Sequence, residues 1–204
     1  MTTRSNSSRE RLLCSAESVI LQRGFSATSI EDILAKACLT KGGFFYHFND
    51  RGELAKALVQ RYLESDRALF QQLLAQAEDL SEDPLQQLLI FLKLFANLMQ
   101  EMESTHPGCL VASFTYESQL FDDELREMMK SGVLEWRQIV ATRLDKILIR
   151  YQPADEFDLE VVADMFTSCI EGGIILSRVL QDNKYLVGQI LAYRNYLRLL
   201  FAAS

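Results

Sequence analysis

The stretch that decides the fold is GFSATSIEDILAKACLTKGGFFYHFNDRGEL, residues 24–54. Thr28, with Glu31 three residues later, fits a capping box, and this predicts a short helix that ends near residue 37. Thr40 can cap a second short helix that runs through Phe44 towards His47. Two short helices joined by a turn of about four residues are typical of a helix-turn-helix unit.

Helical periodicity covers nearly all of the remaining sequence. Apolar residues recur every three or four positions over residues 9–23, and Gly24 is a C-terminal stop for that helix. Further helices are predicted over residues 50–77, 85–103, 109–120, 122–150, 158–179 and 184–201, and no period-two alternation is long enough for a strand. We therefore predict an all-α fold of about nine helices. A helix-turn-helix three-helix domain occupies residues 1–50, and a helical body occupies residues 51–204.

The charge of the chain is unevenly distributed. The whole sequence carries 21 basic and 28 acidic residues, a net charge of −7. Residues 1–61 hold nine Lys and Arg against six Asp and Glu, a balance of +3, which leaves 12 basic against 22 acidic residues for the rest. A basic N-terminal part on an acidic body indicates contact with nucleic acid or a membrane surface, although a solvated charged face gives the same pattern.

Several classes of protein are disfavoured by what the sequence lacks. The longest stretch without a charged residue is Ser104–Tyr116, 13 residues, which is too short to span a membrane. The N-terminus has no apolar segment before a cleavage site, and the four cysteines have neither metal-binding nor disulfide spacing. No GxSxG, HExxH, CxxC or glycine-rich phosphate loop is present. We predict a cytoplasmic protein that is not an enzyme and has no metal or cofactor.

Residues 40–43, TKGG, suit a helix that enters the major groove of DNA, because their side chains are small or form hydrogen bonds. Gly42 and Gly43 each cost about 1 kcal/mol in a helix relative to alanine, so the pair indicates close approach to another surface. A simple loop explains the two glycines equally well. Lys41 is the main candidate for contacting a base such as guanine, and a phosphate contact is its alternative.

Four segments carry a family resemblance: Gly24-Phe25, residues 28–33 (TSIEDI), residues 40–48 (TKGGFFYHF) and residues 51–54 (RGEL). In these segments the chain resembles the N-terminal DNA-binding region of the TetR family of one-component transcriptional regulators. The resemblance implies that the body, residues 51–204, binds a small-molecule effector and forms a homodimer. It also implies that the partner of the N-terminal domain is a double-stranded DNA operator.

The resemblance also implies roles for individual residues. Hydroxyl groups at the start of the second helix would contact phosphate, outward residues of the third helix would meet base edges, and residues after it would contact the DNA backbone. Phe45 departs from the family, whose members usually carry tyrosine there, so either Tyr46 takes over a phosphate contact or the contact is lost. The predicted DNA-binding residues are Thr28, Ser29, Thr40, Lys41, Gly42, Gly43, Phe45, Tyr46, His47 and Lys56.

The last two predicted helices are unusually apolar. Residues 157–179 and 184–201 carry more apolar positions than one core-facing stripe needs, and Gly172-Gly173 would allow two helices to approach closely. Pairing of these helices across a two-fold axis would make a four-helix bundle between two copies. Burial of both faces within one chain is the alternative.

Aromatic and methionine side chains recur at helical spacing in the body. Such residues are often ordinary core, but the family resemblance favours a cavity for an apolar or aromatic effector. The predicted pocket residues are Phe91, Phe95, Met99, Met102, Phe114, Phe121, Trp136 and Phe166.

The sequence therefore predicts a ligand-responsive repressor that binds a palindromic operator as a dimer and is released by its effector. Two alternatives remain open. One is a repressor that senses oxidants or electrophiles through Cys109, because the start of a helix favours a thiolate, although free cysteines are commonly buried apolar residues. The other is a helical small-molecule-binding protein without a DNA function.

Overall fold

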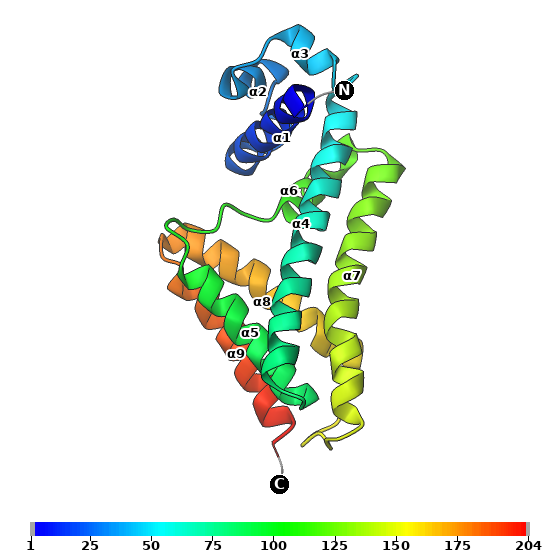
Figure 1. The fold of residues 1–204 in the computed structure, drawn as a ribbon, viewed down its shortest axis with the longest axis vertical. Coiled ribbons are helices and arrows are strands. Elements are labelled where there is room, and N and C mark those ends of the chain that lie inside the picture. The colour runs from blue at the N-terminus through cyan, green and yellow to red at the C-terminus, as the bar shows by residue number, and fades with distance from the viewer. Residues whose placement is uncertain (1–2, 203–204) are drawn as a thin grey trace. The chain divides into compact units, whose positions relative to one another are not determined.

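The structure, a computed structural model, describes residues 3–202, and the side chains of residues 8–202. Over this range the chain is helical and contains no strand (Figure 1), which confirms the predicted all-α fold. The helices are α1 (Thr3–Arg23), α2 (Ile30–Ala37), α3 (Lys41–Phe45), α4 (Arg51–Leu80), α5 (Pro84–Gln100), α6 (Leu110–Thr115), the 3₁₀ helix η1 (Ser118–Leu120), α7 (Asp123–Leu148), α8 (Leu159–Leu180) and α9 (Lys184–Leu200).

The chain divides into two compact units that alternate along the sequence. The first unit contains the residues up to Ser65 together with Pro107–Lys130. The second contains Asp66–His106 and the residues from Ser131 onward, so α4 and α7 contribute to both units. The functional boundary after residue 50 stays a prediction, because compactness and function need not divide a chain at the same place.

The entry to the helix-turn-helix unit is fixed by local hydrogen bonds. Gly24 ends α1 with φ of +87°, and its N–H donates to the Ile20 carbonyl at 2.8 Å. The predicted capping box is wrong by one residue: Ser29 is the N-cap of α2, and its side chain and that of Asp32 satisfy each other's backbone N–H groups. The Thr28 side chain instead is buried and donates to the Gly24 carbonyl at 2.7 Å, so it closes the preceding turn.

The turn between α2 and α3 requires a left-handed backbone. Cys38 is the C-cap of α2 with φ of 53°, a conformation that side chains with a Cβ rarely adopt. Thr40 then caps α3 by accepting a hydrogen bond from the Gly43 N–H at 3.3 Å. Phe44 and Phe48 are buried and anchor the short α3 helix in the first unit.

The segment after residue 109 differs from its prediction. One helix was expected over residues 109–120, but α6 ends at Thr115 and a turn separates it from η1. In that turn Glu117 accepts hydrogen bonds from the N–H groups of Phe25 (2.6 Å) and Ser26 (2.8 Å). The break between α6 and η1 thus lies where the Glu117 carboxylate binds the backbone just before the helix-turn-helix region.

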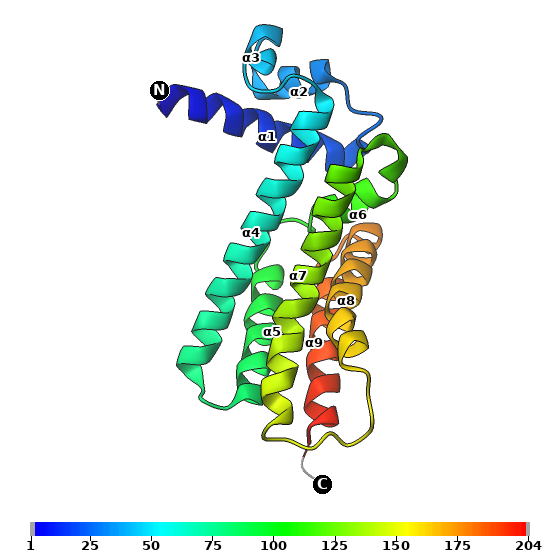
Figure 2. The ribbon, with the colours of Figure 1, turned by 90° about the vertical axis from the view of Figure 1, so that its right-hand side faces the viewer.

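In the second unit α9 lies between α5 and α8 (Figure 2). A Cβ added to Gly173 of α8 would lie 2.9 Å from the Cα of Leu186 in α9, so glycine is required where these two helices meet. The core of the unit includes an aromatic group of Phe70, Phe91, Phe95 and Phe166, with ring centroids 5.6–6.5 Å apart.

Candidate DNA-binding surface

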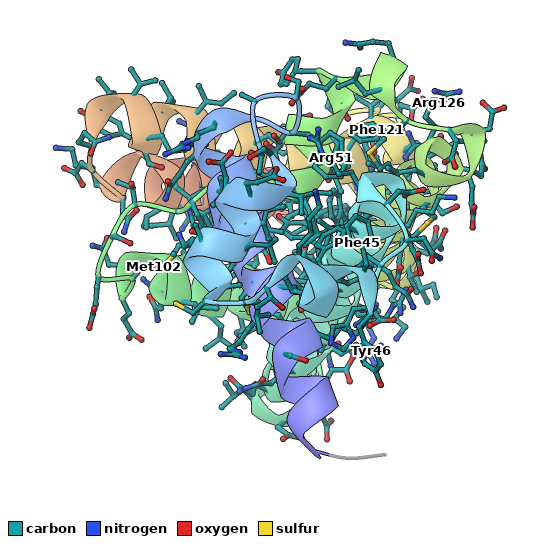
Figure 3. The ribbon with its side chains drawn as sticks, turned by 90° about the horizontal axis from the view of Figure 1, so that it is seen from above. Phe45, Tyr46, Arg51, Met102, Phe121 and Arg126 are labelled. Atoms are coloured by element: carbon teal, nitrogen blue, oxygen red, sulfur yellow. The ribbon has the colours of Figure 1, made fainter. Side chains whose placement is uncertain are left out.

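Helix α3 presents an exposed edge of the first unit. The exposed fraction of the Lys41 side chain is 68%, and Phe45 and Tyr46 are 47% and 64% exposed. Phe45 and Tyr46 are labelled in Figure 3. Phe45 and Tyr46 are therefore two adjacent aromatic residues that are largely exposed, while Phe44 and Phe48 on either side of them are buried. Adjacent exposed aromatic residues are typical of a surface that contacts a partner. The arrangement matches a recognition helix whose inner side is fixed and whose outer side is available.

The two glycines of α3 are not required by the packing of the chain. A Cβ added to Gly42 would meet only the Thr40 Oγ1, at 4.0 Å, and a Cβ added to Gly43 would meet its nearest atom, again Thr40 Oγ1, at 3.6 Å. Both positions are helical, so the loop alternative is wrong. Glycine costs stability here and nothing in the described chain compensates for it, which points to a requirement imposed from outside.

Lys41 is held only loosely. Its Nζ lies 3.7 Å from Glu31 Oε1, and both side chains are about 70% exposed. An ion pair of this kind contributes little to stability and exchanges readily for another anion. Lys41 is therefore available for a base edge or a phosphate.

Two of the predicted DNA-contacting residues are occupied by other partners. The buried Thr28 hydroxyl binds the Gly24 carbonyl. The Lys56 ammonium forms ion pairs with Asp122, at 2.7 Å, and with Glu124, and the hydrogen bonds that it donates to these two carboxylates raise its pKa. The Ser29 hydroxyl is engaged as well: it donates to Asp32 Oδ2 at 2.6 Å and accepts from the Asp32 N–H at 3.0 Å.

His47 is tied to the first helix. Its Nε2 is hydrogen-bonded to Ser8 Oγ at 2.7 Å, while the guanidinium of Arg9 lies over the Phe48 ring, 5.4 Å from its centroid. Burial, and secondarily the charge of Arg9, lower the pKa of His47. No local pattern in the sequence indicates these contacts, because Ser8 precedes His47, and Arg9 precedes Phe48, by 39 residues.

The predicted effector residues fall into two groups. Phe114 and Phe121 belong to the first unit, where their rings stack 4.7 Å apart and both meet Phe25 edge-on. The other six residues belong to the second unit. Met102 is half-buried, and the buried ones are Phe91, Phe95, Met99, Trp136 and Phe166. The sequence could not separate the groups, because helical periodicity says nothing about which helices pack together.

Cys109 is the N-cap of α6 and only 7% exposed. Its Sγ accepts a hydrogen bond from the Ala112 N–H at 3.4 Å. By contrast, Cys14 and Cys38 are exposed. The thiols of Cys14 and Cys38 are therefore more accessible to a reagent in solution than the thiol of Cys109.

Within residues 3–202 no three His, Cys, Asp or Glu side chains are grouped so that they could hold a metal ion. No helix in the same range has the length and apolar character needed to cross a membrane.

Together, a short helix anchored by phenylalanines, an open pair of glycines and an exposed lysine define a helix-turn-helix protein of the DNA-binding class. Residues 12–58 match the family described as bacterial regulatory proteins, tetR family. Residues 84–188 match the family described as transcriptional regulator LmrA/YxaF-like, C-terminal domain. The chain belongs to the TetR family of transcriptional regulators.

Individual relatives agree with this assignment. The chain is 27% identical to the probable regulator ArpR of Pseudomonas putida, over 89% of this chain and 85% of the relative. It is also 27% identical to the regulator YxaF of Bacillus subtilis, over 89% of this chain and 90% of the relative. A TetR regulator from Chloroflexus aurantiacus superimposes with a TM-score of 0.79 at 25% identity, covering 96% of each chain. Because both family models describe transcriptional regulators, the chain is a DNA-binding transcription regulator. Members of the family are generally repressors and are not enzymes.

Proposed function

We propose that the protein is a ligand-responsive repressor that binds a palindromic operator as a homodimer and leaves it when a small apolar or aromatic effector binds. The observation that carries the proposal is the open glycine pair on α3, beside the exposed Lys41. In the cell this regulator would act in the cytoplasm, where bacterial DNA lies.

The proposed DNA contacts follow from what each side chain has available. Lys41 reaches a base or a phosphate, while Gly42 and Gly43 let the duplex approach the helix backbone. Phe45 has no hydrogen-bonding group but can contact a thymine methyl group. The remaining residues of the interface are Ser29, Thr40, Tyr46 and His47. The polar groups of Thr28 and Lys56 have partners within the chain, and so do the Ser29 hydroxyl and His47 Nε2. A polar contact of any of these four groups with DNA would share or replace its present partner.

The experiment is operator binding by Lys41→Ala, measured by fluorescence anisotropy with the DNA upstream of the protein's own gene. We expect affinity to fall about tenfold or more, because a good base contact contributes roughly 1–3 kcal/mol. The matched control is Lys130→Ala, which removes another exposed lysine paired only with Glu127 of its own helix. Equal affinity of the Lys41 variant and the control would show that α3 is not the recognition helix.

Dimerisation is proposed from the outer face of α8 and α9. Val179, Ile175 and Leu199 are 74%, 54% and 57% exposed, and they lie on the sides of their helices that the second unit leaves open. Two such helices from each copy would bury these residues in a four-helix bundle. A two-fold axis through that bundle would relate two recognition helices, which is why the operator is expected to be palindromic.

This part is tested by sedimentation with Val179→Glu at micromolar concentration. We expect the parent protein to sediment as a dimer and the variant as a monomer, because the added charges would be buried against each other. Ile149→Glu is the matched control, since Ile149 is 83% exposed at the end of α7 and is not part of this face. A monomeric parent would end the proposal of a dimer.

The effector is proposed to bind among the aromatic and methionine residues of the second unit. Phe91, Phe95 and Phe166 form contacts with one another, and Trp136 is the only tryptophan in the chain. Binding there should change the fluorescence of Trp136, and a true effector must also release the operator, because coupling requires different affinities for the two states. A compound that changes the fluorescence without releasing DNA would be a ligand but not the effector.

A further inference from the structure

A cavity of about 530 Å³ lies within the first unit, in the size range of small-molecule sites. Its wall comes from three segments: the turn after α1, the first turns of α4, and the region from η1 into α7. The lining residues that carry the argument are Phe25, Arg51, Lys56, Leu120, Phe121 and Asp122. Only Phe121 belongs to the set predicted for the effector, so this is a separate site.

We propose that this cavity binds a small organic acid, with its carboxylate on Arg51 and its flat apolar body against Phe121 and Leu120. The proposal does not depend on where the effector of the second unit binds. It rests on the Arg51 guanidinium, which forms no salt bridge within the described part of the chain, and on an apolar wall beside it.

The charge argument compares the two cations of the lining. Lys56 is already neutralised by Asp122, at 2.7 Å, and by Glu124. Arg51 donates one hydrogen bond to the Phe25 carbonyl and lies over the Phe25 ring, 4.4 Å from its centroid. Within the described part of the chain it forms no ion pair with a carboxylate. A guanidinium has five N–H donors, so most of those of Arg51 remain for a ligand, and a carboxylate matches their fork geometry.

The nearest competing carboxylate is occupied elsewhere. Both oxygens of Glu117 accept backbone hydrogen bonds, one from Phe25 and one from Ser26. Burial opposes ionisation of Glu117, but hydrogen bonds from Ser26 and Phe25, and secondarily the charge of Arg51, outweigh it and lower the pKa of the carboxyl. Glu117 therefore stabilises the turn that carries Phe25, and it leaves the N–H groups of Arg51 without a direct anionic partner.

The apolar wall explains why an organic acid is favoured over an inorganic anion. Leu120 is 51% exposed at the cavity, which is costly unless something covers it. The Phe121 ring is fixed by Phe114 and Phe25, and Arg126 holds the Phe121 carbonyl by a hydrogen bond (Figure 3). A flat apolar body on this wall would bury Leu120 while its carboxylate reached Arg51.

The test uses the full chain and isothermal titration calorimetry with 2-naphthoate as probe and 2-naphthamide as its neutral counterpart. We expect the parent to bind 2-naphthoate, and to bind 2-naphthamide about tenfold more weakly or worse, because a charge-assisted pair is lost. Arg51→Gln should weaken 2-naphthoate binding by about tenfold or more and leave 2-naphthamide binding within about twofold. Leu120→Glu should weaken 2-naphthoate binding similarly, since it places a charged group where the apolar body of the ligand would lie.

The matched control is Arg11→Gln, the same substitution at an exposed arginine of the same unit, which should change 2-naphthoate affinity less than about twofold. Because Arg51 also bonds to the Phe25 carbonyl, circular dichroism must show that Arg51→Gln is folded; if it is not, Leu120→Glu decides. No binding of 2-naphthoate by the parent overturns the proposal, as does unchanged affinity in a folded Arg51→Gln or in Leu120→Glu. None of these outcomes affects the operator test with Lys41→Ala.

Discussion

Two regions of this protein contain a pair of adjacent glycines within a helix, and the pairs have different causes. Around Gly42 and Gly43 in α3, an added Cβ would have room. In α8, an added Cβ on Gly173 would lie 2.9 Å from the backbone of α9, although one on Gly172 would meet nothing within 4 Å. The packing of the chain therefore does not require either glycine of α3, whereas it requires Gly173 in α8. The same dipeptide thus lies at a contact between two helices in α8, and in α3 at an open surface for which we propose a partner.

The largest effect is expected from Gly173→Ala. The new methyl group would force α8 and α9 apart, so we expect the free energy of unfolding to fall by about 1–3 kcal/mol. Gly172→Ala is the neighbouring control and should not lower the free energy of unfolding, because its Cβ enters open space within the chain and alanine favours the helix. Denaturant unfolding of both variants at one protein concentration measures the difference. Equal losses would remove the contrast between the two positions.

Gly42→Ala and Gly43→Ala should separate stability from function. Without a clash in the chain, alanine should raise the free energy of unfolding by about 0.5–1 kcal/mol. Operator affinity should nevertheless fall about tenfold, because the methyl group occupies space that DNA needs. Denaturant unfolding curves check the rise in the free energy of unfolding, and anisotropy titrations check the fall in operator affinity. Stabilised variants that keep full operator affinity would contradict the proposal that DNA requires these glycines.

A smaller effect concerns the left-handed residue that ends a helix in each region. Cys38 (φ 53°) follows α2 and Gln181 (φ 56°) follows α8. Cys38→Gly and Gln181→Gly should each stabilise the protein by about 1 kcal/mol, because glycine adopts this conformation without a steric penalty. Ala35→Gly, in the middle of α2, should have the opposite sign and a similar size. Thermal or denaturant unfolding decides, and a loss in the first two variants would be evidence against strain at these positions.

The smallest effect is a dependence on pH that both regions share. Burial lowers the pKa of His47 in the first unit and of His106 in the second, with a nearby arginine as the second cause for each. A base with a lowered pKa in the folded state binds more protons when unfolded, so its stabilisation is complete above the unfolded pKa of about 6.5 and is lost as the pH falls below it. His47→Gln and His106→Gln should each make the free energy of unfolding less dependent on pH between about 7 and 5. An unchanged slope in both variants would mean that these histidines do not titrate differently on folding.

The helices and the recognition segment could be predicted from the sequence because their signals are local. Apolar spacing, Gly24 and Thr40 each act within one or two helical turns. The error at the capping box shows the limit of this reasoning: Thr28-Glu31 and Ser29-Asp32 are overlapping frames with the same chemistry. The frame was decided by the bond from Thr28 to the Gly24 carbonyl, which commits Thr28 to the turn before the helix.

Contacts between residues that are far apart in the sequence could not be predicted from local sequence patterns. The contact of Lys56 with DNA stays a prediction, and the structure adds its ion pairs with Asp122 and Glu124, more than 60 residues later in the chain. Glu117 lies where the helix predicted over residues 109–120 is interrupted, and its carboxylate accepts hydrogen bonds from the N–H groups of Phe25 and Ser26. Nothing in the spacing of either residue indicates its partner.

The sequence by itself determined that this chain is all-helical, that residues 24–54 form a DNA-recognition module and that the protein is a TetR-family regulator, because periodicity, caps and a motif of fixed spacing are encoded over short distances. Only the tertiary structure decided which glycines are needed for packing, which cation remains unpaired beside a cavity and which aromatic residues share a unit. These properties depend on atoms that packing brings together from distant positions, and on the space that packing leaves open.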